Sequence, residues 1–219
     1  MVSIPENRER GILFAPESVV AAPLLITGLI AGAGSEARPL QAASGQPVGG
    51  SAKRLLDVIV SALMLLVLAP LMLAAAGLVS LLAGPAIVSQ QRVGFGGRHF
   101  TMLKFRTTHA GDARAVCLSN VLRQSGLDEL PQLFNVLKGD MSLVGPQPLM
   151  AEEVKSYGGY ARHYWAARPG LTGLWQPAGT STASYKARMT RDRLYVSKWS
   201  LGLDLALLAK SVLAPLNPK

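Results

Sequence analysis

Two adjacent carboxylates, Asp128 and Glu129, are the residues of this chain whose types and spacing best suit catalysis or metal binding. Neighbouring carboxylates repel each other, so a fold keeps them together most readily when they share a cation or a phosphate-bound metal. Acidic residues followed by Pro131 also suit a first helical turn, where they complement the helix dipole. The pair is therefore either a helix start or the centre of a metal-assisted reaction on phosphate.

The composition favours a membrane surface and phosphate-bearing ligands. The 219 residues include 22 Lys and Arg against 13 Asp and Glu, a net charge of +9, and 49% are hydrophobic. Such a chain suits an anionic membrane. We expect no nucleic-acid partner, because zinc-finger spacing, a basic run and an RNA-binding aromatic motif are all missing. Cys117 stands alone, which excludes a disulfide framework and agrees with a reducing compartment.

Three regions follow one another along the chain. Residues 1–50 are rich in Gly, Ala, Ser and Pro and predict a flexible tail. Residues 51–84 predict a membrane-inserted helical hairpin, because positions 55–83 carry only one charge, Asp57. Residues 85–219 predict a cytoplasmic catalytic domain.

Pro70 decides the geometry expected for the apolar segment. A straight helix over this segment would be roughly 43 Å long, more than the ~30 Å hydrocarbon core, whereas each half is about 21 Å. Both flanks are basic, with Lys53 and Arg54 on one side, which favours keeping both ends in the cytoplasm. We therefore predict a Pro-broken re-entrant helix; one tilted, kinked span is the alternative, since membrane helices tolerate Pro.

The predicted fold is mostly α with a small β-hairpin. The hairpin is expected over 86–106, where two alternating runs flank the glycine-rich turn at 94–97. The last stretch, 199–216, is an apolar helix that carries Asp204 and Lys210. Two charges are costly in lipid, so this helix is expected to be amphipathic and either interfacial or packed on the core.

These features resemble the bacterial sugar transferases, the membrane monotopic phosphoglycosyl transferases that start exopolysaccharide and O-antigen assembly. The resemblance covers about three quarters of the chain, and its longest block, 127–146, is highly specific. The short exopolysaccharide-type galactosyl- or glucosyl-phosphate transferases are the most similar members. The matching blocks are 53–57, the Pro-broken apolar segment, 91–94, 104–107, 127–146, 168–176 and 195–204.

The resemblance implies transfer of a sugar 1-phosphate from a UDP-sugar to undecaprenyl phosphate, with release of UMP, at the cytoplasmic face of the inner membrane. Asp128 would be the nucleophile, while Glu129 and Asp192 would hold Mg²⁺. The protein partners that it suggests are a second copy of the chain, in a homodimer, or downstream glycosyltransferases. The cations expected around the substrate phosphates are Lys104, Arg106, Arg123 and Arg168. Arg123 as a helix-surface charge and Asp192 as an i, i+4 partner on its helix are the structural alternatives.

Two departures from the family pattern leave a second hypothesis open. Gln147 and Thr180 stand where the family usually has Arg, and a neutral side chain cannot replace a bidentate charged donor. The segment between Arg106 and the acidic pair is also shorter than usual. The alternative is a catalytically impaired relative that regulates or scaffolds polysaccharide assembly. A basic, membrane-anchored structural protein would leave the acidic pair unexplained.

Overall fold

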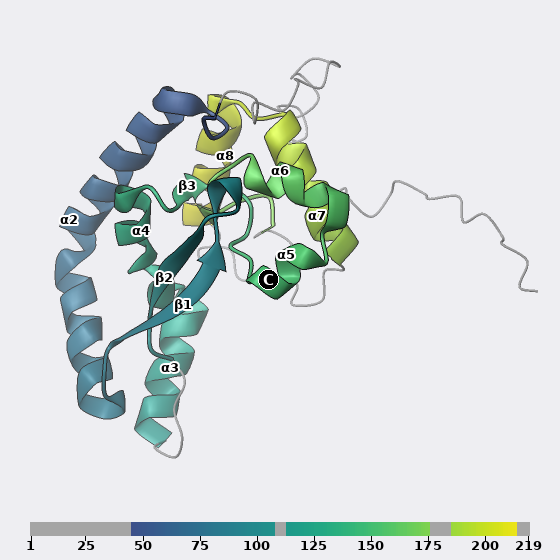
Figure 1. Ribbon diagram of the computed structural model, residues 1–219. Helices are drawn as coiled ribbons and strands as arrows, with labels where there is room; N and C mark the ends of the chain where they lie inside the picture. Colours follow the sequence, from purple (N-terminus) through teal and green to yellow (C-terminus); the bar gives the residue numbers. More distant parts are fainter. Residues whose placement is uncertain (1–44, 108–112, 176–184, 214–219) are drawn as a thin grey trace, which may run out of the picture.

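The computed structural model describes residues 45–107, 113–175 and 185–213; most of the predicted tail and Thr180 lie outside these ranges. Within them the chain is mostly helical with small sheets, which confirms the predicted class (Figure 1). The helices and strands, together with the 3-10 turn η4, are in chain order α2 (Gly50–Ala83), β1 (Ile87–Val93), β2 (His99–Phe105), α3 (Ala113–Ser125), η4 (Leu127–Glu129), α4 (Gln132–Lys138), β3 (Ser142–Val144), α5 (Ala151–Lys155), α6 (Ala161–Trp165), β4 (Gly170–Thr172), α7 (Tyr185–Ser197) and α8 (Leu201–Leu213).

The apolar segment forms one long helix, α2, that runs along one side of the molecule (Figure 1). It continues through Pro70, so the structure does not confirm the predicted division into two helices; the loss of one N–H leaves the rest of the helical ladder intact. How α2 enters a bilayer stays a prediction.

Alone in the described ranges, α2 is long and apolar enough to cross a membrane. Only 17% of its most apolar 18-residue stretch is buried, unlike the core helix of a soluble protein. The exposed apolar surface of α2 therefore indicates association with a membrane. Large apolar side chains that are more than half exposed on α2 are Leu55, Ile59, Leu63, Leu66, Val67, Leu73 and Leu81.

The start of α2 is anchored to the rest of the fold by charged residues. Lys53 Nζ lies 2.6 Å from the carboxylate of Asp204 on α8, and both side chains are buried. Arg54 donates to two carbonyl oxygens of α4, each at 2.6 Å. Asp57 accepts hydrogen bonds from the Ser142 hydroxyl and from a β3 amide, each at 3.0 Å. These contacts explain why charges begin an otherwise apolar helix.

The predicted β-hairpin is confirmed: β1 and β2 pair antiparallel around a short turn. In this register Arg92 lies opposite Phe100 and Val88 lies opposite Lys104. Side chains of paired residues share a face, and every second residue returns to it. Arg92, Met102 and Lys104 therefore occupy one face of the hairpin.

A second sheet, the parallel pair β3 and β4, was not predicted. Gly145 directly follows β3 and lies so close to the backbone around Gly170 that a side chain at either position would collide with main-chain atoms. β3 is fully buried and belongs to the central apolar core together with α4 and α8. Leu203 and Leu207 bury one side of α8 in that core, so α8 is the core-packed form of the predicted amphipathic helix.

Candidate functional site

The acidic pair lies in a single 3-10 turn, η4, between α3 and α4. Gly126 ends α3 with a φ of 70°, a left-handed conformation that glycine adopts at little cost. Asp128 and Glu129 are half-buried, and the chain enters α4 just after them. The turn thus fits the helix-start interpretation locally, but the partners of the two carboxylates come from elsewhere in the fold.

Lys104 is the cation that the fold brings to this pair. Its Nζ lies 2.7 Å from Glu129 Oε1, across 25 residues of sequence, and both side chains are partly exposed. The two residues line a cavity of about 420 Å³, which we call the charged cavity, and this volume suits a small ligand. Its walls consist of Arg92, Met102, Lys104, Glu129, Gln132, Gln147, Pro148, Met150, Glu153, Gly170, Leu171, Trp175 and Arg188.

The electrostatics of Asp128 reflect its crowded position. Burial raises the pKa of its carboxyl group, and the adjacent charge of Glu129 raises it further. Lys104 and Arg123 oppose that rise through their positive charges. Arg123 itself is exposed near the end of α3. The structure therefore gathers Asp128, Glu129 and Lys104, with Arg123 near enough to affect the carboxyl group.

Two other predicted phosphate-binding residues have backbone partners and are not among the residues that line the charged cavity. Arg106 Nε donates to the carbonyl oxygen of Pro85 at 2.9 Å, which ties the end of β2 to the segment after α2. Arg168 Nε donates to the carbonyl oxygen of Gly139 at 2.9 Å, and burial lowers the pKa of its guanidinium. Phosphate binding by these two arginines stays a prediction.

Asp192 is buried in α7 and does not line the charged cavity either. Tyr157 donates a hydrogen bond of 3.1 Å to its carboxylate, and burial raises the pKa of that group to about 7. Arg188, one helical turn earlier, does line the cavity. Within the described ranges no three His, Cys, Asp or Glu side chains form a metal-binding group. Metal ligation by Asp192 stays a prediction.

Sequence reasoning missed a cluster of three charged residues at the wall of the same cavity. Glu153 of α5 lies 3.2 Å from Arg188 and 3.5 Å from Arg92, and all three side chains are largely buried. In the sequence, Arg92 stands out only as part of the block 91–94. The separations of Glu153 from its two partners, 61 and 35 residues, leave no local pattern that could have identified the cluster.

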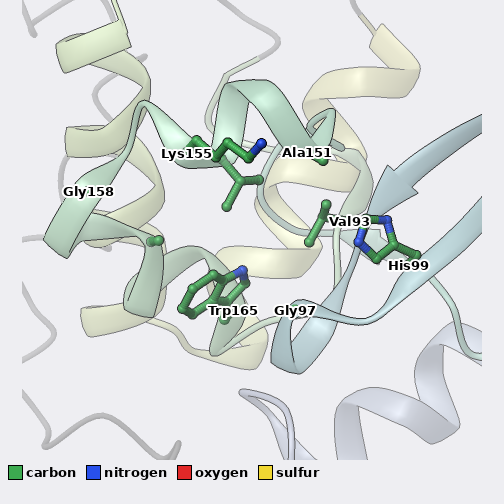
Figure 2. Close-up of a pocket in the computed structure, with 9 residues that line it drawn as sticks. Val93, Gly97, His99, Ala151, Lys155, Gly158 and Trp165 are labelled. Carbon is green, nitrogen blue, oxygen red and sulfur yellow. The ribbon is translucent and has the colours of Figure 1, made fainter.

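A second cavity of about 340 Å³ lies beside the hairpin turn (Figure 2). It is mostly apolar, and its lining includes Val93, Trp165, His99 and Lys155. No carboxylate is among the residues that line it, whereas Glu129 lines the charged cavity and Asp128 is its neighbour in sequence.

Comparison with known proteins agrees with the site. Residues 48–217 match the model of the bacterial sugar transferase family, so the chain belongs to that family and is a transferase enzyme. The exopolysaccharide production protein ExoY of Sinorhizobium fredii is 37% identical over 202 residues, which cover 80% of this chain and 89% of the relative.

Two relatives have more explicit names. A UDP-glucose:undecaprenyl-phosphate glucose-1-phosphate transferase of Caulobacter vibrioides is 40% identical over 181 residues, covering 73% of this chain and 68% of the relative. An undecaprenyl-phosphate galactose phosphotransferase of Salmonella typhimurium is 37% identical over 186 residues, covering 73% of this chain and 39% of the relative. The resemblance inferred from the sequence is thus confirmed.

Proposed function

We propose that this protein transfers a hexose 1-phosphate from a UDP-hexose to undecaprenyl phosphate, releases UMP, and so begins the assembly of an exopolysaccharide. The observation that carries this proposal is the half-buried pair Asp128 and Glu129 in a bacterial sugar transferase, with Glu129 and Lys104 paired at the wall of a 420 Å³ cavity. The names of the relatives support the two substrates.

The chemistry assigned to this chain is a double displacement at one phosphorus atom. A carboxylate oxygen of Asp128 attacks the sugar-proximal phosphorus, the bond from that phosphorus to the bridging oxygen breaks, and UMP leaves with the bond electrons. An oxygen of undecaprenyl phosphate then attacks the phosphorus of the Asp128–phosphosugar intermediate and releases the carboxylate. Lys104 and Arg123 lower the cost of bringing a carboxylate to an anionic diphosphate.

The acidic pair also fits a Mg²⁺ ion. Mg²⁺ is usually bound through one or two carboxylates plus substrate phosphates, so a large protein cage is not required. The mutual repulsion of Asp128 and Glu129, which raises the pKa of Asp128, is the kind of strain that a bound cation relieves. Glu129 would hold the ion, and when bound it would neutralise charge on the diphosphate.

The membrane supplies the second substrate, which cannot leave the bilayer. The exposed apolar surface of α2 supports insertion into the inner membrane with the charged cavity on the cytoplasmic side. A helix that dips in at Pro70 would keep the phosphate of the lipid at headgroup level, where its charge stays hydrated.

A catalytically impaired relative that scaffolds assembly is the second candidate function. The observation that favours it is Gln147, a neutral residue in the wall of the charged cavity at a position where an arginine would add a phosphate donor.

One experiment separates the two candidates: UMP release from a panel of UDP-sugars by the detergent-purified protein with Mg²⁺ and undecaprenyl phosphate. Release that needs the lipid and the metal, and is abolished in Asp128→Asn, supports the transferase. Asp140→Asn is the matched control, because Asp140 forms a looser pair of 3.5 Å with the largely exposed Lys138 and does not line the charged cavity. No release by folded protein across the panel would refute the proposal and favour the impaired relative.

A further inference from the structure

The charged cavity has two ends with different charge. Lys104 and Glu129 mark one end, and the cluster of Glu153, Arg92 and Arg188 marks the other. Lys104 and Arg92 lie on the same face of the hairpin, and the register separates their positions by four residues along the strands. At about 3.3 Å per residue, the two ends are on the order of 13 Å apart at the backbone.

The position of the proposed nucleophile indicates which part of a sugar nucleotide suits each end. Each end holds a carboxylate, since Glu129 is paired with Lys104 and Glu153 with the two arginines, so charge alone does not place the diphosphate. The diphosphate belongs at the end with Lys104, because the sugar-proximal phosphorus must reach the proposed nucleophile Asp128, which lies beside Glu129 and Lys104.

Neutral hydroxyl groups, by contrast, fit the cluster without disrupting it. Oε2 of Glu153 accepts the backbone N–H of Met150 at 2.8 Å, and Oε1 accepts from Arg188 at 3.2 Å. Each carboxylate oxygen can accept more than one hydrogen bond, while each guanidinium offers several donors. Arg92 Nε is buried and has no hydrogen-bond partner in the described part of the chain. Trp175 adds an aromatic surface to the same cavity.

We propose that Glu153, oriented by Arg92 and Arg188, binds the ring hydroxyls of the hexose in the charged cavity and determines which UDP-hexose the protein prefers. This inference rests on the proposed transferase function and assigns the substrate selectivity of that same site. Hydroxyls that differ between epimers are distinguished strongly by such a site, because a mismatched epimer leaves a buried polar group unpaired.

The test measures binding separately from turnover. Dissociation constants for UDP-glucose, UDP-galactose and UMP are measured by calorimetry on the detergent-purified full chain, for the wild type, Glu153→Gln and the matched control Glu152→Gln. Glu152 is the exposed neighbour on α5, so it gives the same charge change outside the cavity. Thermal unfolding of each variant confirms that it is folded.

We expect Glu153→Gln to change the ratio of the two UDP-hexose dissociation constants at least tenfold, with UMP binding and the Glu152→Gln variant within about twofold of wild type. Weakened UMP binding in Glu153→Gln would overturn the proposal and assign the cluster to the nucleoside. An unchanged ratio would also overturn it. Because these readouts need no turnover, failure of the transferase assay itself is a distinct result that refutes the proposed function.

Discussion

The buried ion pair between Lys53 and Asp204 gives a prediction whose size follows from its contacts. Asp204 is fully buried and accepts from Lys53 at 2.6 Å, from Tyr195 at 2.8 Å and from Trp199 at 3.0 Å. Asp204→Asn removes the charge that Lys53 faces and turns an acceptor into a donor. Breaking a buried pair in this way costs about 3–5 kcal/mol, because the remaining charge is left without compensation.

The assay is thermal unfolding of the detergent-purified protein. For a chain of this size each kcal/mol lowers Tm by roughly 2–4 °C, so Asp204→Asn should lower Tm by roughly 6–20 °C. Asp140→Asn is the control, because the pair between Asp140 and Lys138 is 3.5 Å long and the Lys138 side chain is 73% exposed. Asp140 itself is 21% exposed and also accepts a long hydrogen bond of 3.5 Å from Asn135, so the loss should be small, about 0–1 kcal/mol for the ion pair.

Replacing both members of the ion pair tests whether the loss of stability comes from the unpaired charge. Replacing Lys53 with Met and Asp204 with Leu together should recover most of the lost stability, because no unpaired charge is left in the interior. Tyr195 keeps an acceptor in that variant, the carbonyl oxygen of Val144 at 3.0 Å, whereas Trp199 loses the acceptor that Asp204 supplied, so the recovery should be incomplete. Equal Tm values for Asp204→Asn and Asp140→Asn would refute the claim that this pair holds α2 to the fold.

Three further predictions concern the site and the packing around it. Lys104→Met should lower kcat/KM for the UDP-sugar by roughly 100-fold, because the phosphates and Glu129 lose their nearest cation. Gly145→Ala should prevent stable folding, seen as loss of the cooperative melting transition, since its added methyl group collides with backbone. Burial lowers the pKa of His163 below 6.5, so the stability that it contributes above that value is lost as pH falls. Asp192, whose pKa burial raises to about 7, acts in the opposite direction over the same range. Between about pH 7.5 and pH 5, Tm should therefore fall less or rise more with falling pH in His163→Gln than in the wild type.

Matched variants control each of these. Lys138→Met removes a largely exposed lysine and should leave kcat/KM within about twofold. Gly159→Ala adds a methyl group with open space around it, so melting should remain cooperative. His99→Gln changes an exposed histidine and should keep the slope of Tm against pH. If a control and its test variant behaved alike, the contact in question would not contribute to activity or stability in the way its geometry indicates.

The sequence pattern predicted correctly those elements that depend on neighbouring residues, namely the β-hairpin and the long apolar helix. Alternation and glycine placed the hairpin of β1 and β2, and the length of the apolar run placed α2. The preferred division of α2 at Pro70 is not confirmed, and the continuous helix agrees with the alternative of one span, because a proline removes one hydrogen bond but the neighbouring turns can hold the helix together. The parallel pair β3 and β4 was missed because three-residue strands 28 residues apart carry no periodic signal.

The candidate site shows the same division. Asp128, Glu129 and Lys104 were predicted from their sequence blocks, and the structure brings them together. The ion pairs of Glu153 with Arg92 and Arg188 were not predicted, since they join α5 to β1 and α7 across long stretches of chain. Pairing between elements is determined by tertiary packing, which single-sequence patterns do not encode.

The way α2 is packed has a consequence for how the protein responds to its lipid surroundings. The start of α2 is held by Lys53 and Arg54, and its second half packs through Met72, Ala75 and Val79 against the core around Phe105 and Leu122. A helix fixed along its length cannot pivot in response to a thicker or thinner bilayer without carrying the rest of the molecule with it. Bilayer thickness should therefore set the height of the acidic pair above the lipid headgroups, so the rate of the proposed transfer would depend on acyl-chain length.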